Sequence, residues 1–218
     1  MSEMKPSIVG LEPERLSEMQ QQAASEGRLL ATAPHYSDVA WLEAHQSETC
    51  IPAFWWRYSQ PFQRLLAELR KGTIGSLLAV KVKVALPNPE ASHICPAGLD
   101  ICQIIAGSWP TNSRINRPTP ASAHSILEMK FASGLFASSV QIGQVATRPP
   151  SLHLRVVGDT GILQAELFGP MVNISGAVGW QFQPYIEHPM EALWAVRHQP
   201  DELFPTTQQA LAIAYALS

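Results

Sequence analysis

One stretch of the sequence gathers residue types that can do acid–base chemistry. From His93 to Trp109 the chain reads HICPAGLDICQIIAGSW. Asp100 stands one turn inside an apolar helical pattern, where an ionised carboxylate needs hydrogen-bond donors or a nearby cation. It could contact a substrate, or it could be a structural carboxylate that the helix dipole stabilises. His93 in the preceding loop could supply an imidazole, although loop histidines more often bond the backbone.

A second group of candidates precedes residue 60. Trp55 and Trp56 are followed directly by Arg57 and Tyr58. The cation and the phenol could hold an anionic or sugar-like ligand, with the indoles as a platform. The alternative is that these aromatics belong to the core or to an interface. We predict Trp56, Arg57, Tyr58 and Asp100 as substrate-binding candidates.

The cysteines indicate neither a metal site nor a disulfide framework. Cys50, Cys95 and Cys102 form no CxxC pair and have no histidine at metal-ligand spacing. We expect reduced, buried thiols and no metal.

The composition excludes several classes of protein. Of the 218 residues 46% are hydrophobic and only 15% charged, against about 25% charged in typical domains. We therefore expect extensive burial, some of it against another subunit. The net charge of −3 gives no basic surface for nucleic acid or anionic membrane. No apolar run approaches the ~20 residues of a membrane span, and the N-terminus lacks the features of a signal peptide, so we predict a cytoplasmic protein.

Hydrophobic periodicity and turn residues predict the elements that would position these candidates. Helices are expected over 12–26, from 37 or 38 onward, and over 61–70, 97–106, 190–198 and 206–217. Strands are expected over 29–33, 49–58 (a strand or its approach), 77–86, 125–131, 135–145, 151–157, 162–167, 172–174 and 180–182. In the strand over 77–86, Val80, Val82 and Val84 alternate with Lys81 and Lys83, so one face should be solvated.

Strands in the middle with helices at both ends predict an α+β fold, an open and mostly antiparallel sheet with helices packed on one face. Residues 1–50 are expected to form an N-terminal helical appendage and residues 51–218 the α+β domain. The other face of such a sheet needs cover. Because the strands are rich in valine and poor in charge, we predict that this face forms a homodimer interface.

Several short motifs, in their order, resemble the Gfo/Idh/MocA oxidoreductases. WRYSQPFQRLLAELRKGTIGSLLAVKV is similar to the segment in which R-[FY]-x-x-P precedes a helix, a G-x-[IL]-G turn and a long strand. LEMKFASGLFASSVQIGQ resembles the family's hairpin, and LRVVGDTGILQAEL its I-x-G-[ST]-x-G-x-[IL] step. The closing ALWAVRHQPDELFPTTQQALAIAYALS resembles its last helices. The likeness covers roughly residues 55–218 and implies the fold of the family's C-terminal domain.

The stretch around Asp100 departs from the family's D-x-G-x-H-x-x-D. Asp100 matches the last aspartate, but His93 stands for the first aspartate and Cys95 for the glycine. Ala97 stands where the family has the histidine that handles the substrate hydroxyl proton. An alanine methyl cannot exchange a proton. The resemblance therefore implies the fold without its usual proton carrier.

These oxidoreductases combine the sheet domain with an N-terminal Rossmann domain for a nicotinamide cofactor. A Rossmann half needs a strand, G-x-G-x-x-G, a helix and an acidic residue about 20 positions on. The chain does not contain this arrangement. We expect it to bind no cofactor alone, with NAD(P) present only if a partner chain supplies the Rossmann domain.

Near the N-terminus, Glu3-Met4-Lys5-Pro6 resembles the family's E-K-P, whose lysine approaches the reacting carbon. The inserted Met4 breaks the tripeptide, and the alternative is a solvated lysine beside a proline. With this likeness, Lys5, His93 and Asp100 are the candidate catalytic residues.

Two functions remain open, and with them whether the chain is an enzyme. The first is a relative of the oxidoreductase C-terminal domain without its nucleotide-binding half, acting as a non-catalytic binding or assembly protein or as the partner subunit of a dehydrogenase. The alternative is an NAD(P)-dependent oxidoreductase on a sugar-like or polyol substrate, with the Rossmann domain supplied by another chain. A third interpretation is a truncated gene product with no role of its own.

Overall fold

The structure is a computed structural model, and it describes the following residues: 7–9, 30–32, 39, 43, 50–52, 54–87, 96–119, 122, 124–144, 151–167, 171–175, 203 and 206–217. The chain divides into two compact units. One comprises residues 1–55 and 193–218, and the other residues 56–192.

The first unit contains a small parallel sheet. Strands β1 (Ser7–Val9), β2 (Leu30–Thr32) and β3 (Cys50–Pro52) pair in the order β1-β2-β3. Helix α6 (Thr207–Leu217) contacts β3. The strand over 29–33 and the helix over 206–217 are thus confirmed. The parallel pairing was not predicted, because three-residue strands carry no readable periodicity.

By these contacts α6 belongs with the N-terminal strands, whereas the predicted division into 1–50 and 51–218 placed its residues in the α+β domain. The helices expected over 12–26 and 190–198, and the strand over 180–182, lie outside the described residues.

The second unit is built on a seven-stranded sheet in the order β10-β9-β8-β4-β7-β6-β5. Its strands are β4 (Leu77–Pro87), β5 (Asn112–Asn116), β6 (Ser125–Lys130), β7 (Phe136–Gln144), β8 (Ser151–Gly158), β9 (Ile162–Glu166) and β10 (Met171–Ser175). Only the β4–β7 pair is parallel. The predicted open and mostly antiparallel sheet is confirmed.

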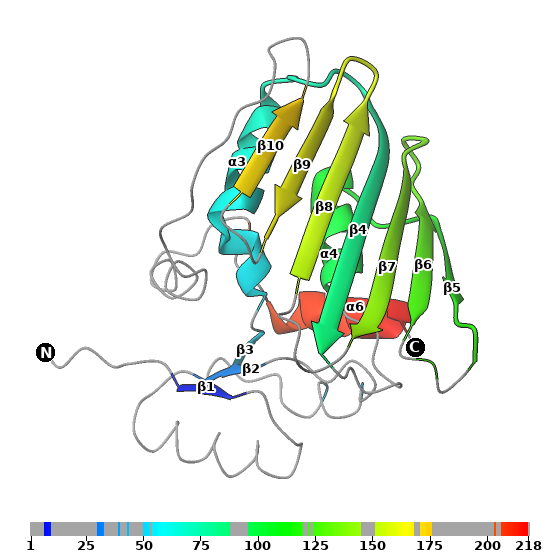
Figure 1. The fold of residues 1–218 in the computed structure, drawn as a ribbon. Coiled ribbons are helices and arrows are strands. Elements are labelled where there is room, and N and C mark those ends of the chain that lie inside the picture. The colour runs from blue at the N-terminus through cyan, green and yellow to red at the C-terminus, as the bar shows by residue number, and fades with distance from the viewer. Residues whose placement is uncertain are drawn as a thin grey trace, which may run out of the picture. The chain divides into compact units, whose positions relative to one another are not determined.

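Two helices cover one face of this sheet. Helix α3 (Gln60–Arg70) contacts β9 and β10, and helix α4 (Ala97–Ala106) contacts β4 and β7. Figure 1 shows both on the same side of the strands. The predicted α+β arrangement, with helices packed on one face, is confirmed.

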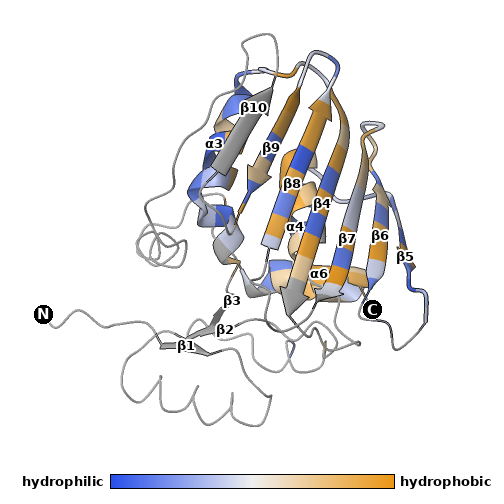
Figure 2. Cartoon of the chain, in the orientation of Figure 1, coloured by the Kyte–Doolittle hydropathy of each residue, from blue (hydrophilic) through white to orange (hydrophobic). Residues whose placement is uncertain are grey.

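Alternation along the central strands decides which side chains meet the helices. Val80, Val82 and Val84 of β4 are buried, and so are Leu152, Leu154 and Val156 of β8. The residues between them on β4 and β8 are polar, so orange and blue alternate along both strands in Figure 2. The valines that led us to expect an apolar open face therefore belong to the covered face. The centre of the open face carries charged side chains.

Helix α3 begins where its sequence signals predict. The side chain of Ser59 accepts a hydrogen bond from the Phe62 amide, and Pro61 occupies the first turn, where a missing N–H costs nothing. Phe62, Leu65 and Leu66 form its buried face.

The aromatic run before this helix is not a strand throughout. Cys50–Pro52 is extended, but Trp55–Tyr58 forms the 3₁₀ turn η1. The turn is closed because both the backbone amide and the hydroxyl of Ser59 donate to the Trp56 carbonyl, at 3.2 and 2.9 Å. The predicted strand over 49–58 is wrong in its second half.

Helix α4 has the predicted bounds. It ends at Gly107, whose φ of 65° is in the left-handed region that favours glycine. Near its start Gly98 lies against Ser139 of β7, where a Cβ would collide with the serine side chain. The helix can therefore pack closely on the sheet at this point.

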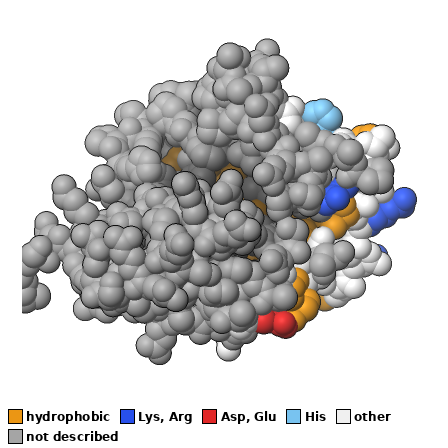
Figure 3. Space-filling view, turned by 90° about the horizontal axis from the view of Figure 1, so that it is seen from below, with side chains coloured by type: hydrophobic (Ala, Val, Ile, Leu, Met, Phe, Trp, Pro, Cys, Tyr) orange, Lys and Arg blue, Asp and Glu red, His pale blue; other side chains and the backbone are white. Residues whose placement is uncertain are grey.

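Two strands were not predicted, β1 (Ser7–Val9) of the small sheet and β5 of the large one. All five residues of β5 are exposed or only half-buried, so this edge strand lacks the apolar alternation that marks the others. Seen from below, Figure 3 shows described side chains of several kinds, with Lys and Arg and a histidine on one side of the view and an acidic side chain apart from them.

Two properties of the described residues limit the classes of site. None of their helices is long and apolar enough to cross a membrane. Nor do the described residues include a cluster of three His, Cys, Asp or Glu side chains that could hold a metal ion.

Candidate functional site

Asp100 lies at the centre of a buried polar cluster, which we call the Asp100 cluster, consisting of Trp56, Arg57 and Asp100. Arg57 Nε donates to Asp100 Oδ2 at 3.0 Å and Nη2 donates to Oδ1 at 2.5 Å, a two-point pairing. The indole Nε1 of Trp56 donates to Oδ2 at 2.6 Å. The carboxylate thus has both the donors and the cation that its apolar helix requires.

Two separate elements bring the cluster together. Trp56 and Arg57 come from η1, and Asp100 comes from the first turn of α4. Pro96, at the N-cap of α4, provides no side-chain hydrogen bond, so Asp100 is the acidic group at that helix end. Gln63 of α3 donates to the Arg57 carbonyl at 2.5 Å and so ties η1 to α3 as well.

Burial closes this cluster to solvent. Asp100 is 0% exposed, Arg57 2% and Trp56 7%. Both carboxylate oxygens already accept hydrogen bonds from Arg57 or Trp56. The geometry favours the structural alternative for Asp100, because a substrate would have to displace a buried guanidinium to reach it.

The predicted site residues divide into two groups. The structure brings Trp56, Arg57 and Asp100 into contact, and Tyr58 is buried in the same 3₁₀ turn. Lys5 and His93 lie outside the described residues, so their catalytic roles stay predictions.

The remaining titratable group on α4 is also closed off. Cys102 is a free thiol, 0% exposed, and burial, assisted by the charge of Asp100, raises its pKa well above the usual range. This confirms the prediction of a reduced, buried cysteine for Cys102. Ala97, where the resembled family has its histidine, is itself 0% exposed. Helix α4 therefore presents no accessible proton-transfer group.

Sequence reasoning missed the residues that support the cluster, Ser59 and Gln63. A signal was available for Ser59, since a serine two residues before a proline and directly before an apolar helical pattern marks a helix start. No sequence signal pairs Arg57 with Asp100, because their contact depends on how η1 and α4 meet.

Comparison with known proteins identifies the fold. No protein-family model matches the chain, and no curated protein matches it in sequence. Solved structures do match over nearly its whole length. UDP-N-acetylglucosamine 3-dehydrogenase GnnA from Acidithiobacillus ferrooxidans is 13% identical with a TM-score of 0.69, and the match covers 99% of this chain and 76% of that one.

Two further structures are similar to the same degree. A putative myo-inositol dehydrogenase from Sinorhizobium meliloti 1021 is 16% identical with a TM-score of 0.69, covering 100% of this chain and 78% of that one. KijD10, a 3-ketoreductase from Actinomadura kijaniata solved with NADP, is 12% identical with a TM-score of 0.69, covering 95% and 73%.

These matches extend beyond residues 55–218, over which the short motifs carry the resemblance. The chain has the fold of Gfo/Idh/MocA-type oxidoreductases.

Proposed function

We propose that this chain is a non-catalytic relative of those oxidoreductases, acting as a binding or assembly protein or as the partner subunit of a dehydrogenase. The observation that carries the proposal is the state of α4. The carboxylate of Asp100 already accepts hydrogen bonds from Arg57 and Trp56. Cys102 is a buried thiol, and the side chain of Ala97 has no proton to exchange. In this account helix α4, which would handle a substrate proton in those oxidoreductases, instead holds η1 through Asp100.

Titration of NADH and NADPH into the full chain tests this proposal. We expect no change in the fluorescence of the nicotinamide ring at micromolar protein, because the chain lacks the glycine-rich turn that holds a dinucleotide pyrophosphate. Micromolar binding that alters the ring fluorescence would overturn the proposal. Nicotinamide fluorescence is the readout because a dinucleotide that binds through its phosphate groups alone leaves the nicotinamide ring in water, and its fluorescence then does not change.

A second candidate function is an NAD(P)-dependent oxidoreductase on a sugar-like or polyol substrate, with the Rossmann domain on another chain. What favours it is that structures named as dehydrogenases and a ketoreductase match 95–100% of this chain. Purification of the native complex followed by the same ring-fluorescence titration distinguishes the two. A change in nicotinamide fluorescence that appears only with a nucleotide-binding partner chain favours the oxidoreductase. The cytoplasmic location stays a prediction in either case.

We also propose a homodimer through the β6 and β7 part of the open face of the sheet, on different residues from those first expected. In this part of the face the apolar side chains are Ile126 of β6 with Val140 and Phe136 of β7, where Ile126 pairs with Val140 and Phe136 follows on the same side. Ile126 is 42% and Phe136 48% exposed. Together with Val140 they form an apolar patch on the surface of the sheet, of the kind that marks protein–protein contacts. Light scattering after size exclusion should give a dimer at micromolar concentration, and a monomer would contradict this.

A further inference from the structure

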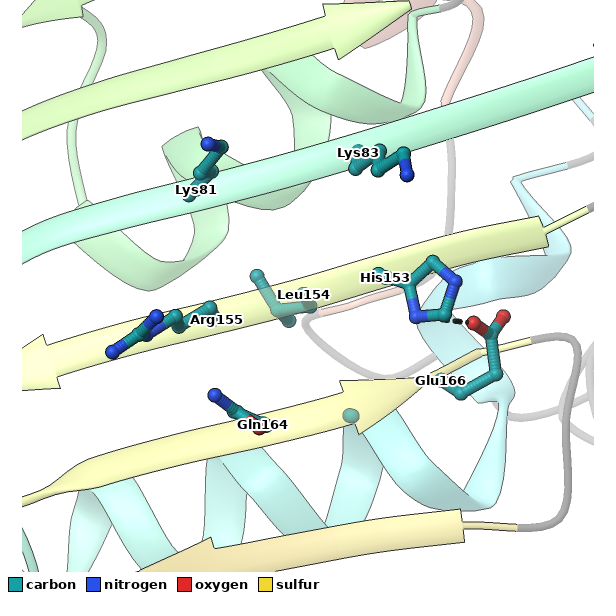
Figure 4. A pocket seen from close by; sticks show the side chains of 8 residues that line it. Lys81, Lys83, His153, Leu154, Arg155, Gln164 and Glu166 are labelled. Carbon is teal, nitrogen blue, oxygen red and sulfur yellow. Dashed lines mark ion pairs between the residues drawn. The ribbon is translucent and has the colours of Figure 1, made fainter. Parts of the chain in front are cut away.

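The open face of the sheet carries a second group of charges, on strands that do not contribute to the Asp100 cluster. Lys81 and Lys83 of β4, His153 and Arg155 of β8, and Gln164 and Glu166 of β9 line a hollow of about 440 Å³. We call it the open-face hollow (Figure 4). We propose that it is a binding site for a small phosphorylated molecule.

Strand register places four basic side chains in a square array. Lys81 is the cross-strand partner of Arg155, and Lys83 that of His153. Directly opposed residues have Cβ atoms about 4.5–5.5 Å apart. Lys81, Lys83, His153 and Arg155 are all exposed and all rise from the face that α3 and α4 leave free. Lys83 and Arg155 extend in opposite directions along the strands in Figure 4, and as long, exposed side chains they can turn toward one ligand between them.

This array is unfavourable for stability as it stands. Like charges directly opposite each other on a sheet are destabilising, and here Lys81 lies opposite Arg155, with Lys83 two residues along β4. Departures of this kind from the rules of stable packing are typical of functional sites. An anion bound between the strands would replace the repulsion by attraction.

The two carboxylates of Glu166 and Glu128, on the same face of the sheet, do not neutralise the array. Glu166 is paired with His153, with 2.6 Å between Oε2 and Nδ1, and its other oxygen accepts from the Leu152 amide at 3.0 Å. Glu128, two strands away on β6, accepts from Asn116 at 3.0 Å. Among the residues that the structure describes, no carboxylate forms an ion pair with Lys81, Lys83 or Arg155. Three positive charges thus remain uncompensated.

The chemistry of these three side chains suits phosphate. A guanidinium binds two phosphate oxygens at once, and lysine ammonium groups add point charges. A phosphate monoester carries about −1.5 to −2 at neutral pH and a diphosphate more, which matches three cations better than a single carboxylate does. The volume of the hollow lies within the ~300–1,000 Å³ of small-molecule sites. The amide of Gln164 beside Arg155 adds a neutral donor.

The dimer proposed above uses β6 and β7, not the strands that line the hollow, so the two proposals are compatible. The site also does not depend on the proposed role of α4. It lies on the face opposite α4, so it stands whether or not that helix takes part in chemistry.

Isothermal calorimetry with inorganic pyrophosphate on the full chain tests the proposal. We expect saturable binding of one pyrophosphate per chain that weakens as ionic strength rises. The double substitution Lys81→Gln with Arg155→Gln should weaken it at least tenfold. The matched control is Arg114→Gln with Lys130→Gln, which removes the same charge from exposed positions of the same face outside the hollow and should change affinity less than twofold.

Three results would overturn the proposal: no saturable binding, an equal loss of affinity in the control, or a change of oligomeric mass by light scattering in the Lys81 and Arg155 variant alone. The last would mean that a second copy of the chain fills the hollow. Circular dichroism of both double variants verifies that they fold, which removal of like charges favours.

Discussion

The two groups of charges in the second unit differ in their burial and in whether the protein itself pairs them. In the Asp100 cluster one carboxylate and one guanidinium are buried, and each satisfies the other. In the open-face hollow three cations are exposed, and no described carboxylate pairs with them. A buried charge must be neutralised within the protein, whereas an exposed charge can be left for a ligand. The first group therefore serves the fold, and the second is available for binding.

The largest effect should follow from breaking the Asp100 cluster. Asp100→Asn leaves the buried Arg57 guanidinium without a negative partner and should lower the free energy of unfolding by about 3–5 kcal/mol. Urea denaturation of the variant and the unsubstituted protein measures the difference.

A double variant without either charge provides the control. Arg57→Met with Asp100→Leu removes both charges, so it should cost less than Asp100→Asn alone. Equal or greater loss in the double variant would mean that shape rather than charge holds η1 to α4.

An intermediate effect is expected at Glu68 on α3. Glu68 itself is buried, but its partner Lys71 is exposed and its partner Arg64 is half-buried. Its Oε1 contacts Lys71 Nζ at 2.8 Å and Arg64 Nη2 at 3.1 Å, and Thr73 Oγ1 donates to Oε2 at 2.8 Å. The hydrogen bond from Lys71, aided by Thr73 and Arg64 and opposed by burial, lowers the pKa of Glu68.

Because the folded-state pKa is lowered, Glu68 contributes stability above its unfolded-state pKa and loses it as the pH falls through the folded-state value. Unfolding free energies of the unsubstituted protein and Glu68→Gln, measured from neutral to acid pH, should differ by about 1 kcal/mol at neutral pH and converge in acid. Parallel curves would show that the ion pairs contribute nothing.

The smallest effect, and one of opposite sign, is expected in the open-face hollow. Lys81→Gln removes the repulsion from Arg155 and should raise the free energy of unfolding by about 0.2–1 kcal/mol at low ionic strength. The gain should shrink as salt is added.

Lys130→Gln is the control for this change, because Lys130 faces Phe136 and Asn112 rather than another cation. The same gain at Lys130 would point to net charge instead of the local array.

Sequence reasoning predicted most of the large sheet because its strands and helices have a regular apolar period. The helix over 97–106 and the alternation of Val80, Val82 and Val84 with Lys81 and Lys83 are examples. It failed where that period is missing, as in the exposed edge strand β5 and the three-residue parallel strands. It also assigned the valines to the open face, because a strand pattern shows that one face is apolar but not which face the helices cover.

The candidate sites could be predicted only in part. The need of Asp100 for a cation follows from its place in an apolar helix, but its partner Arg57 is supplied by tertiary packing. Lys81 and Lys83 could be placed on a solvated face, yet their meeting with Arg155 and His153 depends on the pairing of β4 with β8. Contacts between distant segments carry no local signal in a single sequence.

Amide chemical-shift mapping by NMR, with inorganic pyrophosphate added to the full chain, tests the contrast between the two groups most directly. The account predicts shifts that saturate at Lys81, Lys83 and Arg155 while the amides of Trp56, Arg57 and Asp100 stay unchanged. Saturable shifts centred on η1 and α4, with none on β4 and β8, would contradict it.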